Sequence, residues 1–173
     1  MGLCSMTLNE IANLRLINQQ VASSKYTTAG ELVSWMGAMQ AQDLSMAKWA
    51  VGLRVPGSDV KSIDAAIENG EILRTHALRP TWHFVSPADI HWMLDLSAQR
   101  IKTAMKSMDK ILKLDDAVFS TSNSIIENAF KENHELSREA IVERLVANNI
   151  STSENRVSHI LMRAEMERII CSG

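Results

Sequence analysis

The sequence predicts a mainly α protein with one small β-hairpin, arranged as tandem winged-helix or helix-turn-helix units. Three observations support this fold class. Apolar residues recur at helical spacing along most of the chain, one short central region is rich in β-branched and aromatic residues, and 173 residues contain ten methionines but only three prolines. Helices followed by a two-stranded wing give the element order of a winged-helix domain, although many small α+β domains share that order.

Size and composition fit a soluble globular protein with one substantial domain or two small ones. Hydrophobic residues make up 46% of the chain and charged residues 22%. No apolar run approaches the roughly 20 residues that a membrane span needs, and no secretory signal is visible. The formal net charge of −2 excludes a chain coated in positive charge, but it allows a local basic face. Cys4 and Cys171 fit no metal spacing, which favours a reducing cytoplasm.

The first unit is expected to span residues 1–113 and to begin with amphipathic helices. Their limits come from apolar periodicity and cap residues. The first helix is expected over residues 8–21, and the capping box of Thr28 and Glu31 opens the second. The third is expected over residues 45–53 with Asp43 or Ser45 as N-cap, and the fourth begins at the cap residue Ser58 and ends at Asn69-Gly70.

The stretch from Met36 to Asp43 connects two of these helices and carries two glutamines, two residues apart. Residues i and i+2 lie about 200° apart on a helix and cannot act together, whereas on extended backbone they point the same way. We expect the backbone to extend here, so that the amides of Gln40 and Gln42 lie side by side and form hydrogen bonds without changing charge. In an alternative that stays open, the two glutamines only form hydrogen bonds with backbone groups at a tight connection between helices.

Residues 71–85 are expected to form the β-hairpin, with segments 72–78 and 81–85 on either side of Arg79-Pro80. With a two-residue turn, one face would form core: Leu73, Thr75, Ala77, Trp82 and Phe84. The other face mixes apolar residues with cations and could contact a ligand: Arg74, His76, Leu78, Thr81, His83 and Val85. A three-residue loop would break this parity.

A long helical region follows, with Ser86 as N-cap and Pro87 at the first helical position. Lys102, Lys106 and Lys110 recur every four residues, and Asp109 is the one acid between residues 97 and 114. This lysine stripe is the electrostatic candidate for a contact with a phosphate backbone. A solvated helix face without a ligand would give the same pattern.

The second unit, residues 114–173, is expected to be another helix-turn-helix. One helix is capped by Asp115-Asp116, a second runs from Ser137 to Asn148-Asn149, and a capping box at residues 151–154 opens a third. On this third helix Arg156 is the expected DNA contact, and His159 is expected to be a surface residue without a role. Residues 169–171 begin a strand with no partner in the remaining residues, so we expect the sequence to stop inside a second wing.

Two stretches together resemble a known family. They are residues 39–43, MQAQD, and residues 74–85, RTHALRPTWHFV, followed by SPAD at residues 86–89. Both are similar to segments of the AlkZ/YcaQ family, winged-helix proteins that include DNA glycosylases which unhook interstrand crosslinks. The resemblance covers residues 8–173 and is strongest up to Asp89. Family members are about twice as long, which implies that a C-terminal half, with wings and a β-rich region, is missing.

The resemblance implies a monofunctional DNA glycosylase, a hydrolase that cleaves the N-glycosidic bond of N7-alkylated purines without a cofactor. A purine alkylated at N7 is cationic, so its bond to the sugar is already weakened, and the transition state is oxocarbenium-like. The enzyme must then mainly place one water, which neutral amides can do. Gln40 and Gln42 are the expected water-positioning pair, and Asp43 has a capping or orienting role. Arg79 and His83 are expected to approach the sugar-phosphate backbone, and His76 to lie near the lesion; each also has a purely structural alternative.

Two other functions remain open from the sequence. A winged-helix regulator without chemistry would use the same fold. A helical interaction module, in which the lysine stripe only contacts water, fits the net acidity. No metal cluster, phosphate-binding glycine loop or serine-histidine-aspartate order is visible in the sequence. The leading expectation is a cytoplasmic, nucleoid-associated DNA repair enzyme that acts on alkylated or crosslinked duplex DNA, with no metal and no membrane contact.

Overall fold

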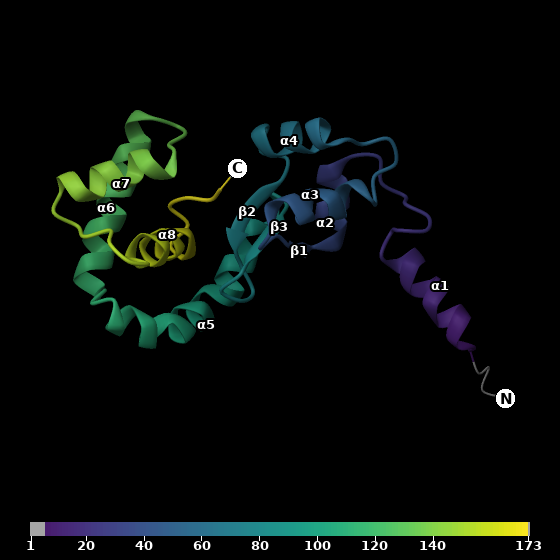
Figure 1. Ribbon diagram of the computed structural model, residues 1–173, viewed down its shortest axis with the longest axis horizontal. Coiled ribbons are helices and arrows are strands. Elements are labelled where there is room, and N and C mark those ends of the chain that lie inside the picture. Colours follow the sequence, from purple (N-terminus) through teal and green to yellow (C-terminus); the bar gives the residue numbers. More distant parts are fainter. Residues whose placement is uncertain (1–5, 173) are drawn as a thin grey trace. The chain divides into compact units, whose positions relative to one another are not determined.

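The computed structural model describes residues 6–172 and confirms the mainly α fold with a small sheet (Figure 1). Cys4, discussed above, lies outside the described residues. The chain forms two compact units: one contains the described residues up to 73 together with 83–89, and the other contains residues 74–82 and 90–172. None of the described helices is long and apolar enough to span a bilayer.

The N-terminal elements follow the order expected for a winged-helix-like fold, with one helix in front. The elements are α1 (Leu8–Asn18), α2 (Ala29–Met36), β1 (Ala38–Gln40), α3 (Leu44–Gly52), α4 (Val60–Glu68), β2 (Leu73–His76) and β3 (Trp82–Val85). The three strands form one sheet in the order β1-β3-β2, and β1 runs antiparallel to β3. The strand β1 was not expected from the sequence, which predicted only extended backbone at this point.

Helix caps explain where the N-terminal helices begin. The Thr28 hydroxyl accepts a hydrogen bond from the Glu31 amide at 3.2 Å, as expected. Helix α4 was expected to be capped by Ser58, which was wrong by one residue. The Ser58 hydroxyl donates to the Val55 carbonyl at 2.8 Å, and Asp59 caps the helix by accepting from the Ser62 amide.

Each unit has its own apolar core. In the first unit, the fully buried side chains are Leu32, Val33, Val51, Ile72 and Phe84. In the second, Ile126, Leu145 and Ile160 lie at the centre.

The second unit contains four helices: α5 (Ile90–Ile111), α6 (Asp116–Glu132), α7 (Arg138–Ala147) and α8 (Arg156–Met166). Asp115 caps α6 as expected, and Ser137, where the next helix was expected to begin, is the N-cap of α7. Helix α5, grouped with the first unit by the expected boundary at residue 113, lies within the second compact unit. In Figure 1, α6, α7 and α8 are coloured green to yellow.

Three expected features of this region were wrong. Helix α5 begins at Ile90, because the Ser86 hydroxyl donates to the Asp89 carboxylate at 2.7 Å within a turn. The capping box at residues 151–154 does not open α8: Glu154 has a positive φ of 56°, and the helix begins after Asn155. Residues 169–171 form no strand; only Ser172 makes an isolated bridge, exchanging two backbone hydrogen bonds of 2.8 and 2.9 Å with Arg74.

Candidate nucleic-acid interface

Gln40 is the last residue of strand β1, and Gln42 lies two residues later in a bend. Gly37, with a positive φ of 74°, ends α2, and β1 follows immediately. Met39 and Ala41 are buried, whereas Gln40 and Gln42 are exposed. This alternation of burial leaves both amides accessible to solvent, although the backbone bends at Gln42. Asp43 then accepts a hydrogen bond from the Met46 amide at 3.0 Å and caps α3.

Strand β3 places a histidine opposite the first glutamine. In the antiparallel register, Gln40 pairs with His83, and Ala38 pairs with Val85. Opposite residues of such a pair lie on the same face with their Cβ atoms about 5 Å apart. His83 is only 5% exposed, so it forms part of the interior beside Gln40.

The expected faces of the hairpin were wrong, because five residues, 77–81, connect the strands instead of two. His76 and His83, assigned to the ligand-facing side, are both buried, and Trp82, assigned to the core, is partly exposed. Arg79 and Pro80 at the centre of the connection are exposed. Of the three candidate contact residues in this motif, Arg79 is therefore the one that is exposed to solvent.

His76 binds a residue that the sequence analysis did not single out. Its ring Nδ1–H donates to the Glu165 carboxylate at 2.9 Å, and its backbone N–H donates to the same oxygen at 2.8 Å. Glu165 lies on α8 and is 2% exposed. The sequence held one signal for this pair, because Glu165 follows Ala164 on the apolar side of α8. Charged residues are rarely buried without a partner, so an acid at that position indicates that it has one.

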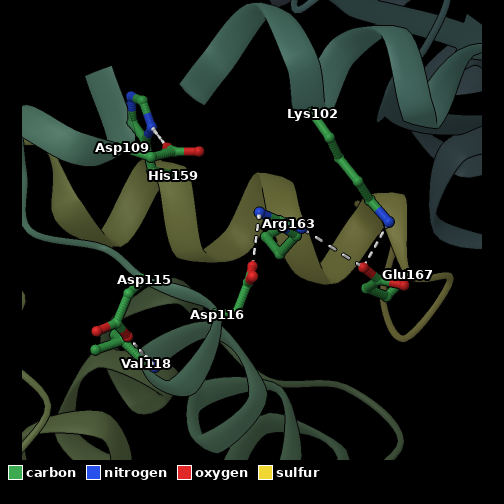
Figure 2. A network of polar contacts seen from close by, with 8 residues as sticks. All are labelled: Lys102, Asp109, Asp115, Asp116, Val118, His159, Arg163 and Glu167. Atoms are coloured by element: carbon green, nitrogen blue, oxygen red, sulfur yellow. Dashed lines mark hydrogen bonds and ion pairs between the residues drawn. The ribbon is translucent and has the colours of Figure 1, made fainter. Parts of the chain in front are cut away.

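The lysine stripe of α5 is only partly available. Lys102 is bound at 2.6 Å to Glu167, the residue that follows α8 (Figure 2). Lys106 and Lys110 are exposed. A shallow pocket of about 430 Å³ lies beside these lysines. Its charged lining consists of Lys106, Lys110, Lys113, Arg163, Asp109, Asp115 and Asp116. The exposed cations of α5 thus lie at one edge of this pocket, with acids among them.

The acid within the stripe is buried and paired. Asp109 is 6% exposed and accepts a hydrogen bond from the His159 Nδ1–H at 2.6 Å (Figure 2). His159 itself is 5% exposed, so the expectation of a surface histidine was wrong. The position of Asp109 between lysines gave no hint of this pair, because the partner comes from α8, fifty residues away.

Helix α8 uses its polar side chains within the protein. The Arg156 guanidinium, expected to contact DNA, donates to the carbonyls of Leu112, Lys113 and Ser151. Arg163 lies 4.2 Å from the centre of the Phe119 ring and close to Asp116 and Glu167 (Figure 2). These contacts connect α8 to the end of α5 and the start of α6.

Within residues 6–172, no three histidine, cysteine, aspartate or glutamate side chains are grouped so that they could hold a metal ion.

Comparison with known proteins identifies the family. The sequence model described as DNA glycosylase AlkZ-like matches residues 33–173. Among solved structures, the DNA glycosylase AlkZ of Streptomyces sahachiroi is similar in fold, with a TM-score of 0.75 and 21% sequence identity over 92% of this chain and 44% of AlkZ. The chain thus spans less than half the length of that relative. Curated proteins gave no match. Since the family model covers most of the sequence, this chain belongs to the AlkZ-like DNA glycosylase family.

Proposed function

We propose that this chain carries the base-excising centre of a DNA glycosylase that hydrolyses the N-glycosidic bond of N7-alkylated purines in duplex DNA. One observation carries the proposal: Gln40, the last residue of β1, and Gln42, in the bend that follows, are both exposed to solvent. Membership of the AlkZ-like family supports a role in DNA repair.

The chemistry asks little of the protein beyond placing water. The N7-alkylated base is already cationic and leaves as a neutral molecule, so it needs no strong general acid. The sugar carbon develops oxocarbenium character, which an added positive charge would oppose. In the proposed mechanism, one glutamine carbonyl accepts a hydrogen bond from the attacking water and the second amide fixes its orientation. Asp43 holds the segment at its C-terminal end by capping α3.

Three exposed cations are the proposed contacts to the duplex: Arg79 of the hairpin and Lys106 and Lys110 of α5. Such contacts neutralise phosphates and release counterions without reading base sequence. Lys102 contributes less in this proposal because Glu167 already neutralises it. Alkylated or crosslinked duplex DNA is the proposed substrate, which places the protein at the nucleoid.

The proposal is tested by release of 7-methylguanine from alkylated duplex DNA. Gln42→Ala and Gln40→Ala are each expected to slow release by roughly 10- to 100-fold, because a misplaced water costs about that much. Gln99→Ala is the control, since Gln99 is an exposed glutamine on α5. Unchanged release in Gln42→Ala would remove the assigned role. Duplex binding without any release by the unmodified chain would instead favour a winged-helix regulator.

A further inference from the structure

Helix α8 places one carboxylate where it holds the end of strand β2. Glu165 Oε2 accepts three hydrogen bonds from two consecutive residues: from the Thr75 hydroxyl at 3.1 Å, the His76 amide at 2.8 Å and the His76 ring at 2.9 Å. The side chains of Glu165 and His76 are 2% and 9% exposed. A buried carboxylate is costly unless donors compensate it, and bonds to a charged acceptor are about twice as strong as neutral ones.

Aromatic and cationic groups complete this cluster. The Trp82 ring lies 3.9 Å from the His76 ring, and the Arg74 guanidinium lies 4.2 Å from the Trp82 ring. Burial lowers the pKa of Arg74, and the negative charge of Glu165 opposes that shift. We call these residues the hairpin anchor: Arg74, Thr75, His76, Trp82 and Glu165. His76 directly precedes the connection 77–81 and Trp82 directly follows it, so the anchor holds both of its ends.

The connection itself is tightly folded. The Arg79 amide donates to the Ala77 carbonyl at 2.6 Å, and the Thr81 amide donates to the Arg79 carbonyl at 2.7 Å. Leu78 has a positive φ of 62°, which is rare for a residue with a branched side chain. Such a conformation persists only where the surrounding structure imposes it. The direction of the exposed Arg79 side chain therefore depends on how the two ends are held.

We propose that Glu165 is a positioning residue for DNA binding: from α8 it holds the connection 77–81 in the conformation in which Arg79 meets the phosphates of the duplex. This inference rests on the proposed function, in which Arg79 is a duplex contact. Glu165 itself touches no substrate and acts through His76 and Thr75.

A double-mutant cycle on duplex binding tests the inference. Glu165→Gln keeps an oxygen that can accept from the Thr75 and His76 groups but removes the charge. Glu165→Gln and Arg79→Ala are each expected to weaken binding at fixed salt by roughly five- to tenfold, and the double variant should bind no more weakly than Arg79→Ala alone. Independent losses that multiply would overturn the inference, as would unchanged binding by Glu165→Gln. Glu143→Gln, an exposed acid on α7, controls for the change in net charge.

A second measurement needs no DNA. Amide hydrogen exchange at Arg79 and Thr81 should be at least several-fold faster in Glu165→Gln than in the unmodified chain, with exchange in the α7 core unchanged. If the unmodified chain fails to bind duplex DNA, the proposed function fails, while faster exchange at these two amides still supports the positioning role. Unchanged exchange overturns the positioning role whatever the binding result.

Discussion

At the scale of single residues, the second unit depends on two buried histidine–carboxylate pairs. Asp109 with His159 connects α5 to α8, and Glu165 with His76 connects α8 to β2. Both pairs are almost fully buried, in contrast to the exposed pair of Asp95 and Arg168, whose side chains are 61% and 48% exposed. The stability of the unit should therefore respond very differently to the loss of a buried and of an exposed acid.

Replacing Asp109 tests this difference. Asp109→Ala leaves a buried imidazole without its acceptor and is expected to lower the free energy of unfolding by about 1–3 kcal/mol. Asp95→Ala removes a solvent-screened pair and should change it by about 0–1 kcal/mol. Urea unfolding of both variants measures the contrast. Equal effects would mean that the Asp109–His159 hydrogen bond adds nothing beyond a surface ion pair.

The thiol of Cys171 reports on the same surroundings. Cys171 is exposed, but desolvation by neighbouring groups, and secondarily the negative charge of Glu165, raises the pKa of this thiol above its ordinary value of 9.0. The reactive thiolate is thus scarcer in the folded chain than in the unfolded chain. In a Cys4→Ser background, alkylation by iodoacetamide at pH 8 should be slower in buffer than in urea. The folded rate should rise in Glu165→Gln, and a fall would contradict the assigned effect of the carboxylate.

At the scale of elements, the sequence predicted helices better than connections. The caps Thr28 and Asp115 were identified correctly because a cap is a local hydrogen bond within four residues. Strand β1 was missed because three residues are too few to show a period, and its pairing with β3 comes from a distant part of the chain. The expected length of the hairpin connection was also wrong. This error changed the predicted faces, because a single added residue moves every following side chain to the other face of the strand.

The sequence placed Gln40 correctly on extended backbone, but it missed the bend at Gln42 and could not place the histidines. Alternation of Met39 and Ala41 with Gln40 and Gln42 is visible along four consecutive residues. The burial of His76, by contrast, depends on Glu165, which lies 89 residues away in the chain. Contacts of that kind leave no local pattern.

Carboxylates at the starts of helices should make the fold sensitive to acid. Hydrogen bonds from Thr27 and Thr28 hold the pKa of Glu31 below its ordinary value of 4.5. Its stabilising effect is therefore complete above that value and is lost as the pH falls through the lower pKa of the folded state. Glu31→Gln should lower the urea midpoint at pH 7 but not at pH 2. Glu68→Gln, near the end of α4, is the control. A urea midpoint that Glu31→Gln lowers more at pH 2 than at pH 7 would contradict this effect.

At the scale of the whole molecule, charge is distributed unevenly despite the net value of −2. Helix α4 carries Asp64 and Glu68 against Lys61, and Asp64 is paired with Lys48 of α3. Helix α5, by contrast, carries exposed cations. The proposed duplex contacts therefore belong to α5 and the hairpin instead of α4.

The salt dependence of duplex binding tests this assignment. Each phosphate contact adds about 0.9 to the slope of log affinity against log salt concentration. Lys106→Glu with Lys110→Glu should thus reduce the slope by about 2 on any duplex sequence. Lys61→Glu on α4 should leave it unchanged. A slope altered only by the Lys61 variant would move the contact to α4.

The internal bonds of Arg156 have one more consequence. The guanidinium donates from Nε and Nη1 to three carbonyls of the chain, which fixes its orientation and leaves only the Nη2 donors for other partners. In the proposed function, the other cations contact sugar and phosphate, so duplex binding by this part of the protein would not depend on base sequence. Such binding would suit an enzyme whose proposed target is a chemical lesion that can occur in any sequence.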